Sequence, residues 1–210
     1  MSALATFLAS AADGPRDGVI RAAPALLGIP EAEIIGRLRI DDERIYERLY
    51  RVFRPRLAAI AREYVSQAMA DEIAHDVLTL VWERRATWPI ERGLATYLYA
   101  SARNRARDQI RHDGVVGRVV ARGIEASETP AAGAPPGLPD AILERSELGQ
   151  AFVRALRALP DGARVAFTLR WVHQLSYPEI AEIMNVSEPA ARKQVSRARE
   201  TLLTQLTAFL

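Results

Sequence analysis

The feature that most constrains this chain is the stretch from Ser176 to Leu203, which predicts two capped helices joined by a short turn. Ser176 followed three residues later by Glu179 is the capping-box pattern that marks a helix start. Asn185 tolerates the left-handed conformation that ends helices, and Ser187 is suited to cap a second helix. Two capped helices separated by about three residues are typical of a helix-turn-helix.

The second of these helices has a small apolar face and a basic face. Its inward residues are predicted from their spacing of four, three and four: Ala191, Val195, Ala198 and Leu202. The opposite side carries Lys193, Ser196, Arg197 and Glu200, with Arg192, Gln194 and Arg199 on the flanks. Arginine and lysine suit guanine acceptors and phosphates, and glutamine suits adenine. A basic helix face is often merely solvated, but the caps, the turn and the small inward residues together favour a nucleic-acid-binding helix.

Composition restricts the other functional classes. The formal charge of the 210 residues is only +2, so any basicity that serves nucleic acid must be local, as it is in this helix. The absence of cysteine excludes disulfide frameworks and thiolate zinc sites. His75, His112 and His173 lack metal-ligand spacing, and neither a phosphate loop nor a nucleophile with its base occurs, so we expect no metal, no cofactor and no enzymatic activity. No membrane span and no secretory signal are expected, which predicts a cytoplasmic protein.

A compact bundle of three amphipathic helices is predicted for residues 41–112. The expected helix starts are Asp41 or Asp42, Asp71 and Leu94. The first helix is expected to kink or restart at Pro55, and the third to end near Arg111.

The flanking segments complete the predicted organisation. Residues 1–40 form an N-terminal extension of unknown role. Residues 113–140 lose helical periodicity and are punctuated by glycine and proline, which predicts a flexible linker. Residues 141–210 then read as about four helices, the first from Ala141 to Leu159 and the second opened by Asp161. The sequence therefore predicts an all-α fold of two small helical domains joined by a flexible linker, the C-terminal one containing the helix-turn-helix.

The third predicted helix of the bundle carries a second concentration of cations. Arg103, Arg105, Arg107 and Arg111 are opposed by Asp108 alone, and aromatic residues precede them at Trp88, Tyr97 and Tyr99. Exposed rings beside arginines suit single-stranded nucleic acid, because bases stack on the rings while cations follow the backbone. The pattern is equally compatible with Trp88 and Tyr97 merely closing the bundle.

Taken together, these stretches resemble bacterial RNA polymerase sigma factors of the extracytoplasmic-function (ECF) group, over roughly residues 45–112 and 143–203. Four stretches carry the resemblance. Those in the first half are Asp71–Glu83, which is similar to the region 2.2 helix, and Thr96–Asp108, which is similar to regions 2.3 and 2.4. Those in the second half are Leu156–Pro160, similar to the opening of region 4, and Ser176–Leu202, similar to its helix-turn-helix signature.

The resemblance implies a protein that binds core RNA polymerase, at the clamp and flap regions of the large subunits, and directs promoter recognition and DNA opening. The implied contacts with core polymerase are Glu72, His75 and Asp76, where His75 replaces the family's usual glutamine. The implied contacts with the −10 element are Trp88, Tyr97, Arg103, Asn104, Arg107 and Arg111. The implied contacts with the −35 element are Arg192, Lys193, Gln194, Ser196, Arg197 and Arg199. An anti-sigma factor is a further partner that the resemblance suggests.

A second interpretation stays open at this point. A stand-alone helix-turn-helix regulator, whose N-terminal bundle binds a ligand or dimerises, would also show a capped recognition helix. Such a regulator would bind duplex DNA without polymerase, whereas a sigma factor would bind its promoter weakly or not at all when alone.

Overall fold

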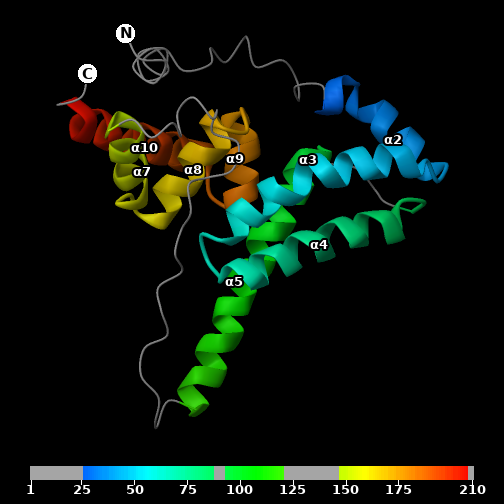
Figure 1. Ribbon diagram of the computed structural model, residues 1–210, viewed down its shortest axis with the longest axis horizontal. Coiled ribbons are helices and arrows are strands. Elements are labelled where there is room, and N and C mark those ends of the chain that lie inside the picture. The colour runs from blue at the N-terminus through cyan, green and yellow to red at the C-terminus, as the bar shows by residue number, and fades with distance from the viewer. Residues whose placement is uncertain (1–25, 88–92, 121–146, 208–210) are drawn as a thin grey trace. The chain divides into compact units, whose positions relative to one another are not determined.

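The computed structural model describes residues 26–87, 93–120 and 147–207, and all regular secondary structure within these ranges is helical (Figure 1). The helices belong to two compact units, one within Ala25–Gly133 and the other within Ala134–Leu210. The predicted all-α fold is thus confirmed. No helix in the described ranges is both long enough and apolar enough to cross a bilayer.

In its described residues, the first unit forms a short 3-10 turn and four α-helices. These are η1 (Leu26–Gly28), α2 (Glu31–Arg39), α3 (Glu43–Ala61), α4 (Gln67–Arg84) and α5 (Leu94–Val120). Helix α3 packs against both α4 and α5, which also touch each other, and α2 lies along α3 (Figure 1). The core of this unit is therefore built around α3, whose Ile45, Leu49 and Phe53 are buried.

The start of α3 agrees with the prediction, but Pro55 does not interrupt the helix. The Asp42 side chain accepts hydrogen bonds from the backbone N–H groups of Arg44 at 3.0 Å and Ile45 at 3.2 Å. Helix α3 then continues through Pro55 to Ala61. Pro55 is exposed, so the carbonyl that its ring displaces can tilt toward water, and the expected restart is wrong.

Helices α4 and α5 are both longer than predicted. Ser66, not Asp71, caps α4, because the Ser66 hydroxyl accepts a hydrogen bond from Met69 N at 3.5 Å. Helix α5 starts at Leu94 as expected but continues past Arg111 to Val120, into residues assigned to the linker. Each helical glycine costs only about 1 kcal/mol, so the glycines after Arg111 do not suffice to end the helix. The rest of the predicted linker, residues 121–140, lies outside the described residues.

Helix α2 occupies the last part of the segment predicted as an extension of unknown role. Ile34 and Leu38 are buried, and α2 contacts α3. The Glu31 carboxylate accepts a hydrogen bond from Leu94 N at 2.6 Å, at the first residue of α5. Helix α2 is therefore packed into the first unit, and residues 1–25 lie outside the described residues.

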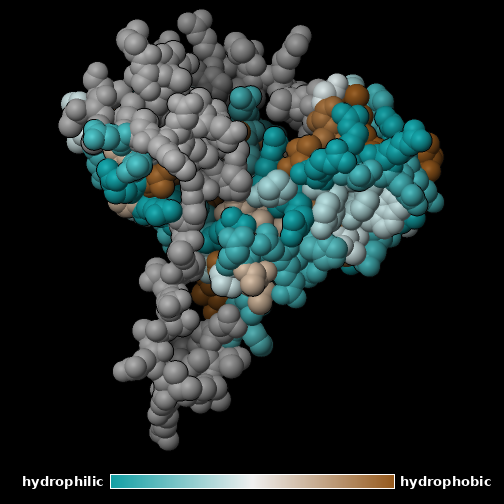
Figure 2. All heavy atoms as spheres, viewed as in Figure 1, coloured by the Kyte–Doolittle hydropathy of each residue, from teal (hydrophilic) through white to brown (hydrophobic). Residues whose placement is uncertain are grey.

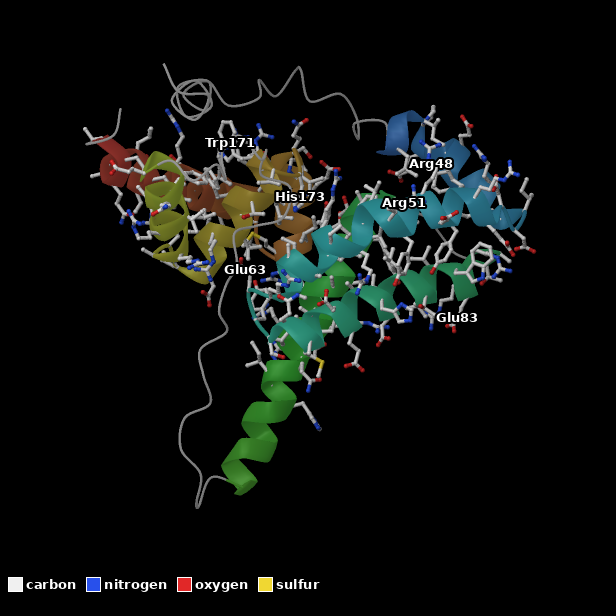
Figure 3. All side chains as sticks on the ribbon, in the orientation of Figure 1. Arg48, Arg51, Glu63, Glu83, Trp171 and His173 are labelled. Carbon is white, nitrogen blue, oxygen red and sulfur yellow. The ribbon has the colours of Figure 1, made fainter. Side chains whose placement is uncertain are left out.

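Within residues 147–207, the second unit forms four helices. These are α7 (Glu147–Arg157), α8 (Asp161–Trp171), α9 (Tyr177–Met184) and α10 (Glu188–Leu206). Helix α10 contacts each of the other three, and its buried Leu202 shares an apolar core with Phe152 of α7 and Phe167 of α8. Trp171 is the last residue of α8, and His173 follows in the connection to α9 (Figure 3). Helix α8 begins at Asp161 as predicted, whereas the expected first helix start at residue 141 is outside the described ranges.

Candidate nucleic-acid and polymerase interfaces

The predicted helix-turn-helix is formed by α9, a short turn and α10. Ser176 and Glu179 form a reciprocal capping box, in which Glu179 N donates to the Ser176 hydroxyl at 3.4 Å and Ser176 N donates to the Glu179 carboxylate at 2.7 Å. Asn185 ends α9 in the left-handed conformation, with φ 53° and ψ 53°. Ser187 caps α10 by accepting a hydrogen bond from Ala190 N at 3.4 Å. The predicted caps and turn are all confirmed.

Helix α10 has one buried face and one open face. The four residues predicted to pack inward are all buried: Ala191, Val195, Ala198 and Leu202. The exposed residues of α10 up to Glu200 are Glu188, Pro189, Arg192, Lys193, Ser196, Arg197 and Glu200. Their spacing by three and four residues forms one continuous stripe, which we call the α10 stripe. Arg192 belongs to this stripe rather than to a flank.

Gln194 and Arg199 do not lie on the α10 stripe. Both are half-buried, because each lies three residues from one buried residue of α10 and four from another, which places it at the border of the packed face. Gln194 lies against α8, where a methyl group added to Gly162 would come within 3.1 Å of the Gln194 side-chain oxygen. That oxygen is shielded from solvent and has no hydrogen-bond partner among the described residues. The geometry gives no support to the predicted base contact of Gln194.

Arg192 is held by two neighbours within the second unit. Its Nη2 lies 3.0 Å from the Glu188 carboxylate, one turn earlier on α10. Its guanidinium carbon lies 4.2 Å from the centre of the Tyr177 ring, which is the first residue of α9. Sequence reasoning missed Tyr177, because nothing local to α10 indicates which residue of α9 will lie beside it.

The −10 candidates lie on or near α5, in the first unit. Asn104 and Arg111 are exposed, Tyr97 and Arg107 are half-buried, and Trp88 is outside the described residues. Arg111 lies 3.1 Å from Asp108 in an exposed ion pair. Asn104, Arg107 and Arg111 are spaced by three and four residues and therefore share one side of the helix.

Arg103 is not on that surface. Its side chain is buried, with 6% exposure, and its Nε donates to the Tyr64 hydroxyl at 3.2 Å. Arg103 follows buried Tyr99 by four residues, so it points to the interior of the bundle. In this conformation Arg103 cannot make the predicted contact with the DNA strand of the −10 element. The i, i+4 spacing from Tyr99 would have indicated this burial if Tyr99 had been assigned to the core. Burial raises the pKa of the Tyr99 hydroxyl.

The polymerase candidates are exposed on α4. Glu72, His75 and Asp76 all face solvent, although two of them have partners within the unit. The Tyr50 hydroxyl lies 3.0 Å from His75 Nδ1, and Arg105 Nη1 lies 3.3 Å from the Asp76 carboxylate. Figure 2 shows that most of the visible surface over α3 and α4 is hydrophilic, and Figure 3 shows Glu83 projecting from the far end of α4. The exposed charged side chains of α4 are mainly acidic, with Glu72, Asp76 and Glu83 against Arg84, and an acidic helix face suits a cationic protein partner.

Comparison with known proteins decides the family. The family model of Sigma-70 region 2 matches residues 49–115, and that of Sigma-70, region 4 matches residues 149–202. The ECF RNA polymerase sigma factor SigW of Bacillus subtilis (strain 168) is 30% identical over 144 residues, which cover 65% of this chain and 75% of the relative. The chain belongs to the ECF RNA polymerase sigma factors.

Other relatives of this sigma factor agree. The ECF RNA polymerase sigma-E factor of Escherichia coli (strain K12) is 25% identical over 181 residues, covering 80% of this chain and 90% of the relative. The fold is shared with the sigma factor RpoE in complex with the anti-sigma factor NepR from Bartonella quintana, at a TM-score of 0.55 and 24% identity over 74% of this chain and 92% of that one. It is also shared with CnrH in complex with the cytosolic domain of CnrY, at a TM-score of 0.55 and 20% identity over 85% and 97%.

Family membership confirms the predicted function in its general form. This sigma factor directs transcription initiation at promoters, and the interpretation as a stand-alone regulator is not supported. Sigma factors are initiation factors rather than enzymes.

Proposed function

We propose that this sigma factor reads the −35 element with the α10 stripe, holds the separated strand of the −10 element with α5, and docks on core polymerase through α4. The observation that carries the −35 assignment is the continuous exposure of Arg192, Lys193, Ser196 and Arg197 on a helix whose opposite face is buried. A recognition helix contacts base edges through its N-terminal part, which is where these residues lie.

The α10 stripe combines two kinds of contact. Arginine or lysine donates to the O6 and N7 acceptors of guanine in the major groove, and each good base contact discriminates against the wrong base by about 1–3 kcal/mol. The same cations also neutralise phosphates, which sets orientation without reading sequence. Ser196 donates its hydroxyl to Glu200 at 3.0 Å and keeps acceptor capacity for a base or phosphate.

The −10 assignment requires a surface for single-stranded DNA. Asn104, Arg107 and Arg111 follow one side of α5 and supply an amide and two cations, while Trp88 and Tyr97 supply rings for unstacked bases. Stacking on aromatic side chains contributes about 1–3 kcal/mol per base, which offsets the cost of separating the strands. We propose that Arg103 supports this surface from inside the bundle through Tyr64 rather than by touching DNA.

The docking assignment rests on exposed polar groups of α4. Glu72 and Asp76 offer carboxylates to cations of the polymerase clamp, and Tyr50 orients the His75 ring through the contact at Nδ1.

We extend to this chain the binding of an anti-sigma factor that is described for the RpoE relative, and we place both partners in the cytoplasm, where the polymerase acts. On the polymerase, the second unit would contact the flap while the first contacts the clamp. Two weak DNA contacts held at one spacing then bind as a single strong one.

The proposal is tested with holoenzyme reconstituted from core polymerase and two charge-removing double variants. Arg192→Ala with Lys193→Ala should change −35 preference and reduce transcription about tenfold or more, because it removes two exposed cations from the α10 stripe. Arg107→Ala with Arg111→Ala should instead reduce promoter opening, and a template already unpaired at −10 should restore most of its activity.

Matched controls remove the same charge elsewhere in each unit. Arg154 and Arg157 are exposed on α7, and Arg44 and Arg54 are exposed on α3. Alanine at either control pair should leave −35 preference and opening unchanged. If the α7 pair shifts −35 preference as strongly as the α10 pair, the α10 stripe is not the recognition surface. If the unpaired template restores both double variants equally, the division of labour between the two units is wrong.

A further inference from the structure

Tyr177, the first residue of α9, contacts cations from two other helices. The guanidinium carbon of Arg170, near the end of α8, lies 4.3 Å from the ring centre of Tyr177. The guanidinium carbon of Arg192 on α10 lies 4.2 Å from the same ring centre. Both distances are well inside the range of cation–π contact. The Tyr177 ring thus contacts both guanidinium groups.

Arg170, the buried one of these two cations, is fixed in place. Arg170 is only 2% exposed, and its Nη1 donates to the carbonyl oxygen of Leu175 at 3.0 Å, in the connection between α8 and α9. A buried guanidinium bonded to a backbone carbonyl cannot change rotamer without leaving its charge unsatisfied. Arg170 therefore braces the Tyr177 ring.

Arg192, the exposed one of the two cations, is held against the same Tyr177 ring. Arg192 also pairs with Glu188 at 3.0 Å, so its guanidinium is restrained from two directions although its side chain is half exposed. Lys193 and Arg197, the other cations of the α10 stripe, have neither an ion pair nor a ring contact within the described residues. The stripe thus contains one oriented cation beside two that can change rotamer freely.

Orientation matters for reading a base. Cation–π attraction acts through the charge of the guanidinium and not through its N–H donors, so the contact with Tyr177 itself takes up no donor of Arg192. A side chain already held in its binding orientation loses less freedom on binding, and it contacts an acceptor at one position better than acceptors at neighbouring positions. Freely rotating cations instead reach whichever phosphate is near.

We infer that Tyr177, braced by Arg170, is a positioning residue that makes Arg192 the sequence-reading cation of the α10 stripe. The inference rests on the proposed −35 role of α10 and adds which residue sets its specificity. Tyr177 itself needs no contact with DNA for this role.

The test compares Tyr177→Phe, which keeps the ring, with Tyr177→Leu, which removes it. Wild-type holoenzyme first selects its preferred −35 element from a randomised library, and each variant holoenzyme is then measured on that promoter and on its single-base −35 variants. Tyr177→Phe should discriminate as the wild type does. Tyr177→Leu should lose about 3- to 30-fold of discrimination at one or two adjacent base pairs, as expected for a lost cation–π contact. The dependence of log affinity on log salt should keep its slope, since no phosphate contact is removed.

A double-variant cycle shows whether Tyr177 acts through Arg192. Tyr177→Leu combined with Arg192→Ala should discriminate no worse than Arg192→Ala alone. Additive losses, an equal defect in Tyr177→Phe, or a uniform loss on all sequences in Tyr177→Leu would each overturn the inference. Thermal unfolding of each variant is followed in parallel, and Tyr177→Met replaces the leucine variant if that one unfolds early.

The same data separate this inference from the proposed function. If Arg192→Ala with Lys193→Ala leaves −35 preference unchanged, the proposed role of α10 is wrong and this inference is wrong with it. If the double variant changes the preference but Arg192→Ala alone does not, Arg192 is not the sequence-reading cation and only this inference is refuted. If Arg192→Ala changes the preference and neither Tyr177→Leu nor Tyr177→Met does, only the role of Tyr177 is refuted.

Discussion

Replacing Asn185 by valine should destabilise the second unit, because the turn of the helix-turn-helix depends on a left-handed residue at this position. Asn185 has φ 53° and ψ 53°, and its N–H donates to the carbonyl of Glu182 at 3.1 Å. The next N–H, of Val186, donates to the carbonyl of Ala181 at 3.0 Å. A left-handed L-residue costs about 1–2 kcal/mol, and asparagine lowers this cost whereas a β-branched residue does not. We therefore expect Asn185→Val to lower the free energy of unfolding by about 1–2 kcal/mol.

The matched comparison is Asn185→Gly, which adopts the same conformation without strain and should stay within about 0.5 kcal/mol of the wild type. For a domain of this size, the valine variant should melt about 4–16 °C lower. Hydrogen exchange of α9 and α10 amides in the full-length protein locates the effect in the second unit. Equal stability of the valine and glycine variants would refute the reasoning, since it would show that the turn does not require a left-handed residue.

Two further predictions concern the first unit. Arg103→Lys should lower the unfolding free energy by about 1–3 kcal/mol in urea titration, because lysine cannot reproduce the bond to Tyr64 from a buried site, whereas Arg107→Lys should change it by less than about 0.5 kcal/mol. Equal effects would mean that Arg103 is not structural. Asp42→Asn should reduce acid sensitivity, since the hydrogen bond from Arg37 holds the pKa of Asp42 below its ordinary value of 3.8. A lowered folded-state pKa gives stability that is present above pH 3.8 and lost as pH falls through the folded value. Melting temperatures between about pH 2 and 5 measure this effect, and Glu83→Gln is the control. If the plot of melting temperature against pH runs parallel for Asp42→Asn and the wild type, the prediction is contradicted.

The helix-turn-helix was predictable residue by residue because its signals are local. Each cap involves groups within three residues of each other, and the left-handed turn is a property of Asn185 and its neighbours. The start of α4 was not predictable in this way, since Ser66 and Asp71 are both suitable caps. Packing decides between them: Ala70 is fully buried, and its burial extends the helix upstream of Asp71.

Residues at the border of a helix face were the harder part of the site. Helical periodicity placed Gln194 and Arg192 alike on the flanks of α10, yet one packs against α8 and the other is exposed. The difference arises because Gly162 has no side chain, so α8 can approach Gln194 closely. That approach is a tertiary contact between segments more than thirty residues apart, which no pattern within α10 encodes.

The number of arginines in the sequence overstates the positive charge that can reach DNA, because three of the described arginines are buried and hydrogen-bonded within their units. Arg103 is bonded to Tyr64, Arg170 to the carbonyl of Leu175, and Arg164 to the carbonyl of Leu159 at 2.9 Å, and all three are at most 8% exposed. Arg164 also donates to the carbonyl of Arg157 at the end of α7, where backbone acceptors lack intrahelical partners, and Arg170 satisfies a carbonyl in the connection between α8 and α9. The salt dependence of promoter binding, about 0.9 in log affinity per log salt for each phosphate neutralised, therefore reflects the exposed cations alone. The buried arginines act on promoter choice only through the surfaces that they hold in place.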